Sequence, residues 1–247
     1  MTNAFLWGLL ATSSLILGGA LGLWVDFRER TLGIIMAFGA GVLISAVAYE
    51  LTADAVRAAR FTGVPGAGFL VGALTFFFLD MIIGKVGGGD RKAIEPTHPR
   101  HLVIPLVLAI FLDGIPESAV FGLGILEGGS VSIAMLVAVF ISNLPEAIVG
   151  TSGMKQAKRP GWAILSLWAV IAVICAFASA AGFGLLGGAS ELWMSFIKMF
   201  AGGAILMMLA NTMMPEAYNH GGKLAGIFTV LGFMVSVGII LLEHGAA

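Results

Sequence analysis

The sequence predicts an all-α membrane protein with eight transmembrane helices. Hydrophobic residues make up 59% of the 247 residues and charged residues only 11%, whereas roughly a quarter of the residues in a soluble domain are charged. The mean hydropathy is +1.02, and apolar stretches long enough to cross a bilayer, about 20 residues each, recur along the chain. These stretches are uniformly apolar rather than alternating, which favours helices over a membrane β-barrel.

Short connectors with turn or charged residues separate the apolar stretches, which together predict a single transmembrane domain over residues 1–247. No Lys or Arg precedes the first stretch and its apolar run is long, so we interpret it as a retained helix rather than a signal peptide. The segment 87–100 is predicted to be a cytoplasmic loop between the third and fourth helices. The eight predicted helices are 4–25, 32–53, 65–86, 102–126, 130–154, 161–186, 192–214 and 223–242.

The basic residues predict the orientation. The first, third, fifth and seventh connectors carry ten of the 13 Lys and Arg residues. Because Lys and Arg concentrate on the cytoplasmic side, we expect both termini to be extracytoplasmic. The 13 basic residues are balanced by 14 acidic ones, which argues against nucleic acid as a partner, and a single cysteine, Cys175, excludes a disulfide scaffold.

The chain also repeats itself twice. A shift of 29 residues superposes 111–124 on 140–153, with Phe, Pro, Glu, Val and the final Gly coincident. A shift of 162 residues superposes 38–55 on 200–217. The members of each pair cross the membrane in opposite senses, so we expect helices 1–3 and 6–8 to form an inverted repeat around the central fourth and fifth helices. Many transporters build two access states around one site in this way.

The two central helices carry polar residues near their predicted midpoints. Asp113 and Glu117 are four residues apart and share a helix face, as do Ser142 and Glu146, while Asn143 precedes Glu146 by three. A charged side chain at the bilayer centre costs about 2.5–3.5 kcal/mol and by default marks a functional site. A single carboxyl could instead be protonated and hydrogen-bonded as structural glue, but two matched Pro-Glu motifs favour function.

Two prolines make further oxygen atoms available near these side chains. Pro116 and Pro145 each lack an amide hydrogen and so free a carbonyl four residues earlier, at Leu112 and Ile141. A free carbonyl inside a membrane needs a partner, which a cation or its water can supply. We therefore predict a site that holds a divalent cation, protons, or each in turn.

Two further polar groups lie near helix ends. Glu50 and Asp54 are predicted to form the entrance to the central site, and Asn211, Glu216 and His220 its exit. Solvated residues at helix ends would give the same pattern.

The motifs Asp113-Gly-Ile-Pro-Glu117 and Ser142-Asn-Leu-Pro-Glu146, with Met214-Pro-Glu216-Ala, resemble the ZIP (Zrt/Irt-like) family of divalent-metal transporters in a divergent prokaryotic form. The resemblance implies a metal site between the fourth and fifth helices, a homodimer in the lipid bilayer of a bacterial inner membrane, and metal movement toward the cytoplasm. The metal ion is then the substrate. Asp113 and Ser142 stand where that family has histidine, and oxygen ligands suit Mn or Fe(II) better than Zn.

Two other functions stay open. The glutamates could relay protons for a carrier of a non-metal substrate, or, as a weaker alternative, the chain could be an intramembrane hydrolase. The sequence contains no Gly-x-Gly-Asp, His-Glu-x-x-His or Gly-x-Ser-x-Gly motif. We therefore expect a transporter rather than an enzyme.

Overall fold

The computed structural model describes residues 1–60, 62–85, 103–128 and 132–245; the side chains of 103–111, 113, 127, 128, 244 and 245 lie outside this description, as does the predicted loop 87–100. The helices are α1 (Thr2–Trp24), α2 (Glu29–Ala46), η1 (Val47–Ala53), α3 (Asp54–Ala58), α4 (Val64–Ile83), α5 (Val103–Gly128), α6 (Ile133–Gln156), α7 (Gly161–Leu186), α8 (Glu191–Met208), η4 (Leu209–Met213), α9 (Met214–Gly221) and α10 (Lys223–Gly245).

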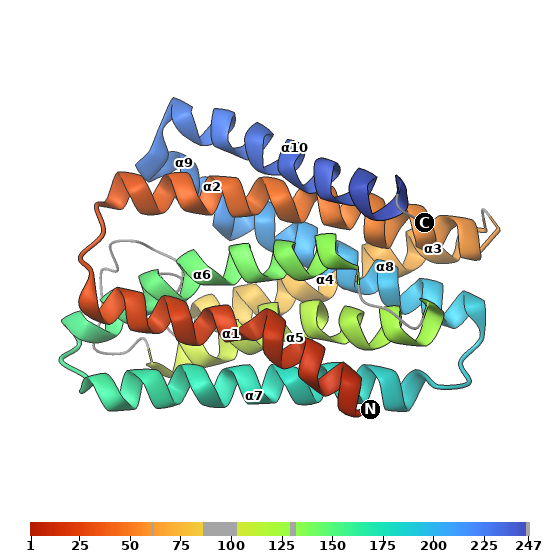
Figure 1. Cartoon of the computed structure of the whole chain (residues 1–247), viewed down its shortest axis with the longest axis horizontal. Coiled ribbons are helices and arrows are strands. Elements are labelled where there is room, and N and C mark those ends of the chain that lie inside the picture. The colour runs from red at the N-terminus through yellow and green to blue at the C-terminus, as the bar shows by residue number, and fades with distance from the viewer. Residues whose placement is uncertain (61, 86–102, 129–131, 246–247) are drawn as a thin grey trace.

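The predicted all-helical class is confirmed, because the described residues contain helices and short connections but no strand. Seven helices within the described ranges are long and apolar enough to cross a membrane, and α5 has 26 residues with an apolar segment over Gly114–Leu126. The long helices run side by side along the long axis (Figure 1). These properties agree with a polytopic membrane protein.

Two helices are longer than hydropathy predicts. The α2 helix continues through η1 into α3, so that one helix covers Glu29–Ala58, and α8 continues through η4 into α9 to cover Glu191–Gly221. Both η1 and η4 are π-helical. A π-helical turn widens the backbone ring to i→i+5 and commonly occurs at functional sites.

The helices form an inner and an outer set. Buried residues make up 67% of the most apolar window of the α2–α3 helix, 61% of that of α6 and 56% of that of the α8–α9 helix, against 22% for α4 and 17% for α10. Outward-facing apolar side chains such as Phe78 and Val230 are 52% and 63% exposed, as expected where lipid replaces water as the solvent. The α5 helix contributes Val120 and Phe121 to the core that the inner helices share.

Glycines allow the outer helices to approach the inner ones closely. Any Cβ at Gly72 of α4 would collide with the carbonyl of Phe200 on α8, and any Cβ at Gly232 of α10 would collide with the carbonyl of Phe38 on α2. Close backbone approach at small residues is the usual way in which membrane helices associate.

Polar contacts fix several helix ends. Ser132 accepts a hydrogen bond from the Met135 amide at 3.2 Å, and the Glu243 carboxylate accepts one from the Ile133 amide at 3.0 Å. Both bonds satisfy free amides at the start of α6, where negative charge is also favourable.

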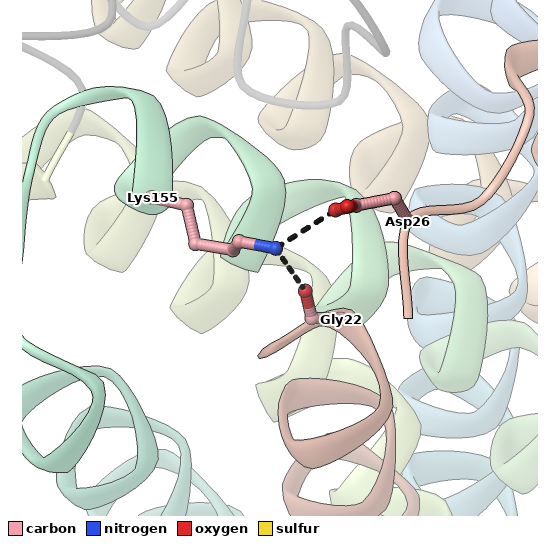
Figure 2. Close-up of polar contacts among 3 residues, drawn as sticks. All are labelled: Gly22, Asp26 and Lys155. Atoms are coloured by element: carbon pink, nitrogen blue, oxygen red, sulfur yellow. Dashed lines mark hydrogen bonds and ion pairs between the residues drawn. The ribbon is translucent and has the colours of Figure 1, made fainter. Parts of the chain in front are cut away.

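A basic side chain binds the C-terminal end of α1. The Lys155 ammonium donates to the Gly22 carbonyl at 3.3 Å and pairs with the Asp26 carboxylate at 2.9 Å (Figure 2). The contact joins the last turn of α6 to the last turn of α1 and places a positive charge at a helix C-terminus, which is favourable.

Candidate metal centre

One face of α5 packs closely against α7. A Cβ at Gly114 would lie 2.8 Å from the Cys175 sulfur, so the α5 backbone touches the thiol. Glu117 and Ser118 follow Gly114 by three and four residues and therefore lie on the same side of α5. Both are buried, at 2% and 0% exposed. The side chain of Asp113, predicted as a ligand on this helix, lies outside the described residues.

The matching face of α6 borders a small cavity. Ser142 and Glu146 line this cavity of about 10 Å³ together with Met36 of α2, Val149 of α6 and Met213 of η4. This volume is barely enough to hold one water molecule. The Ser142 hydroxyl donates to the Val139 carbonyl at 3.1 Å. Asn143 is buried but does not line the cavity.

Both prolines lie inside continuous helices, Pro116 in α5 and Pro145 in α6. The carbonyl of Ile141, freed by Pro145, faces Gly39 of α2, where a Cβ would lie 3.5 Å from the carbonyl oxygen and 3.2 Å from the Ser142 Cα. A glycine at position 39 therefore brings α2 close to the oxygen-rich face of α6.

Cys175 connects the two faces. It is fully buried in α7, packs in the same cluster as Ala147 of α6, and its thiol is within electrostatic reach of both Glu117 and Glu146. Sequence reasoning gave this residue no role in the site. No motif surrounds it, and only the packing of α7 against α5 and α1 brings it near both glutamates.

The two central helices hardly touch each other. The α5 helix packs mainly on α7 and α8, whereas α6 packs mainly on α1 and α2. Within the described part of the chain, no three His, Cys, Asp or Glu side chains are close enough to hold one metal ion. The described residues thus contain no preformed three-ligand metal site, and the side chain of Asp113, a predicted ligand, lies outside them.

The predicted entrance contains a buried cation. Lys198 of α8 is 6% exposed, and its ammonium lies 3.9 Å from the Asp54 carboxylate at the start of α3. Glu50 is half-buried in η1, four residues before Asp54. Sequence reasoning placed Lys198 inside the seventh helix without giving it a role.

At the predicted exit, His220 lies between two carboxylates. Its Nε2 is 3.1 Å from Glu216 of the same helix, and its Nδ1 is 3.4 Å from Glu29 at the start of α2. Asn211 is exposed in η4. Glu29, which sequence reasoning missed, joins this group because Gly33 lets α2 approach Gly221 of α9 closely.

No protein-family model matches the chain, and no curated protein matches it.

Proposed function

We propose that this chain moves a divalent metal cation across the membrane toward the cytoplasm through the face of α5 with Glu117 and the face of α6 with Glu146. The observation that carries the proposal is that two carboxylates lie inside an apolar helical bundle: Glu117 is 2% exposed, and half-buried Glu146 lines a small cavity with Ser142. Buried carboxylates need a proton or a counter-cation. A transported cation can supply that charge and then leave.

The sequence resemblance to the ZIP family supports the same function. The Pro-Glu motifs at Glu117 and Glu146 and the Met214-Pro-Glu216-Ala segment carry the resemblance. It extends the proposal to a homodimer in a bacterial inner membrane with extracytoplasmic termini. The substrate would be Zn, Mn or Fe(II), and the activity is transport rather than catalysis.

Matched packing supports an inverted repeat of helices 1–3 and 6–8. Gly41 of α2 packs on the Thr229 carbonyl of α10, and Gly203 of α8 packs on the Phe69 carbonyl of α4. Gly41 and Gly203 are 162 residues apart, as are the first residues of η1 and η4, Val47 and Leu209. The sequence repeat has the same shift of 162 residues. The contact of α2 with α10 therefore corresponds to the contact of α8 with α4, and the π-helical segment η1 corresponds to η4. Inverted repeats commonly alternate access to a central site.

The proposed path begins at Glu50 and Asp54 and ends at Glu216 and His220. Each group lies near the C-terminal end of a long helix, Glu29–Ala58 for the entrance and Glu191–Gly221 for the exit. The two helices end at opposite ends of the bundle (Figure 1). Carboxylate and imidazole ligands suit first-row divalent metals. The path therefore offers metal ligands at each stage.

The test is metal uptake into proteoliposomes that contain the full-length protein. Glu117→Gln and Glu146→Gln remove one charge each at nearly constant size, and we expect each to lower the initial rate of Mn²⁺, Fe²⁺ or Zn²⁺ uptake by about 100-fold or more, since one lost ligand of a buried ion costs several kcal/mol. Glu191→Gln, at an exposed position in the first turn of α8, is the matched control and should keep the wild-type rate.

Uptake that survives in both glutamine variants would refute the proposal. If no metal binds or moves while the two variants change proton flux, the glutamates instead serve a proton-coupled carrier of a non-metal substrate.

A further inference from the structure

We propose that Lys198 of α8 takes the place of a metal ion in the half of the central site that contains Glu117. Each chain then binds a single divalent cation, in the other half, which contains Glu146. The inference rests on the proposed transport function and specifies how many ions the site holds and which residue sets that number.

The first support is the burial of the lysine. Lys198 belongs to the membrane-spanning helix Glu191–Gly221, and only 6% of it is exposed. Its ammonium lies 3.9 Å from the carboxylate of Asp54, whose side chain is 52% exposed. An ionisable side chain enclosed in a membrane bundle is costly and by default has a function. The half-exposed partner gives little stability in return, so structural support alone does not explain the lysine.

The second support is the position of the lysine in the repeat. The shift of 162 residues matches it with Met36 of α2. Packing around the two positions follows the same shift. The Ser195 hydroxyl of α8 donates to the Ala55 carbonyl of α3. The repeat matches these two residues with Gly33 and Ala217, and a Cβ at Gly33 would lie 3.0 Å from the Ala217 carbonyl oxygen.

Met36 borders the central site, because it lines the cavity of about 10 Å³ beside Glu146. The shift of 29 residues matches Glu146 with Glu117. The two shifts together therefore place Lys198 beside Glu117, as Met36 lies beside Glu146.

The packing of α8 on α5 agrees with this placement. The two helices meet around a cavity of about 400 Å³ that Pro116 of α5 and Phe200 of α8 both line. Two other members of the cavity beside Glu146, Val149 and Met213, are matched with Val120 and Leu51. The matched residues are 6% and 1% exposed and belong to one core cluster. The surroundings of the two glutamates thus correspond, except that a lysine replaces a methionine.

This exchange decides where a cation can bind. Buried carboxylates need a proton or a counter-cation, and the ammonium supplies a fixed positive charge to the half with Glu117. A divalent ion in that half would be repelled twice as strongly as a second unit charge at the same distance. In the half with Glu146 the matched side chain is uncharged, so the carboxylate there attracts the transported ion.

The decisive experiment counts the ions that the purified full-length protein binds. Mn²⁺ is titrated into the protein, and free Mn²⁺ is measured by its electron paramagnetic resonance signal, which is sharp in water and broadens on binding. We expect one Mn²⁺ ion per chain. This measurement needs no variant and so does not depend on how a substitution folds.

Variants then test the role of the lysine. Lys198→Met introduces the residue that the repeat has at position 36, and we expect it to bind two Mn²⁺ ions per chain. Adding Glu117→Gln to this variant should remove the second ion. Lys198→Arg keeps the charge and should still bind one ion. Lys155→Met, which removes the exposed pair with Asp26, is the matched control and should also bind one.

The outcomes separate this inference from the transport proposal. Two ions bound to the unmodified chain, an unchanged count in Lys198→Met, or a second ion that survives Glu117→Gln would each overturn the inference and leave the transport proposal standing. If no divalent metal binds at all, the transport proposal fails and the inference fails with it.

Discussion

Lys198 is a buried cation at the proposed entrance, beside the Asp54 carboxylate. Its ammonium is 3.9 Å from Asp54, whose side chain is 52% exposed. Two unit charges at this distance interact with an energy of about 1 kcal/mol in water and about 4 kcal/mol near a protein surface. The partial exposure of Asp54 favours the lower value. The lysine therefore opposes an incoming metal ion at the entrance.

We expect Lys198→Met to lower the KM for metal uptake by about threefold to tenfold, because the substitution removes this repulsion and keeps an apolar stem of similar length. The measurement is initial uptake in proteoliposomes over a range of metal concentrations at fixed ionic strength. Lys155→Met, at the other end of the bundle, should leave KM unchanged. Equal shifts in the two variants would mean that Lys198 has no special role at the entrance.

The residue scale also shows what sequence can and cannot reveal about the site. Glu117 and Glu146 are recognisable because each follows a proline in an otherwise apolar stretch, where both residue types are costly. Cys175 carries no such signal, because cysteine is an ordinary buried residue. Its relation to the glutamates depends on the register of α7 against α5, and three-dimensional packing sets that register through residues such as Gly114.

The helices themselves are largely predictable, because hydropathy follows burial in lipid. The sixth predicted helix, 161–186, has the bounds of α7, Gly161–Leu186. The second and seventh extend past their predicted ends at residues 53 and 214, to Ala58 and Gly221. Hydropathy falls where polar residues begin, but backbone hydrogen bonding continues beyond that point. The π-helical segments η1 and η4 could not be predicted, because segments this short are too brief to show a periodic pattern in the sequence.

Helix association depends on single glycines, and α4 offers a direct comparison. Gly72 faces the Phe200 carbonyl of α8, whereas nothing lies within 4 Å of a Cβ at Gly66 of the same helix. We expect Gly72→Ala to lower the free energy of unfolding by about 1–3 kcal/mol through overpacking. Gly66→Ala should be neutral or slightly stabilising. Thermal unfolding of both purified variants in one detergent measures the difference, and equal melting temperatures would contradict the close packing of α4 on α8.

The whole molecule has two chemically different ends. Lys155, Lys158 and Arg159 lie near the α6–α7 connection, at the same end of the bundle as the α1–α2 and α9–α10 connections, while the start of α1 and the end of α10 lie at the opposite end (Figure 1). Arg28 and Lys223 belong to the first end as well. Because Lys and Arg concentrate on the cytoplasmic side of membrane proteins, we propose that this end faces the cytoplasm, which would set the direction of the proposed transport.

This orientation predicts opposite results for two reporter fusions in bacterial cells. Alkaline phosphatase fused after residue 247 should be active, because that enzyme matures only after export, and green fluorescent protein at the same position should stay dark. The same reporters fused after Arg159, between α6 and α7, should give the reverse result and serve as the internal control. If charge decides the orientation, moving four Lys or Arg residues from the basic end to the opposite end of the bundle should reverse the reporter results. A fluorescent C-terminal fusion in the unmodified chain would place the basic end outside and invert the proposed direction of transport, since Glu216 and His220 would then face the outer solution and Glu50 and Asp54 the cytoplasm.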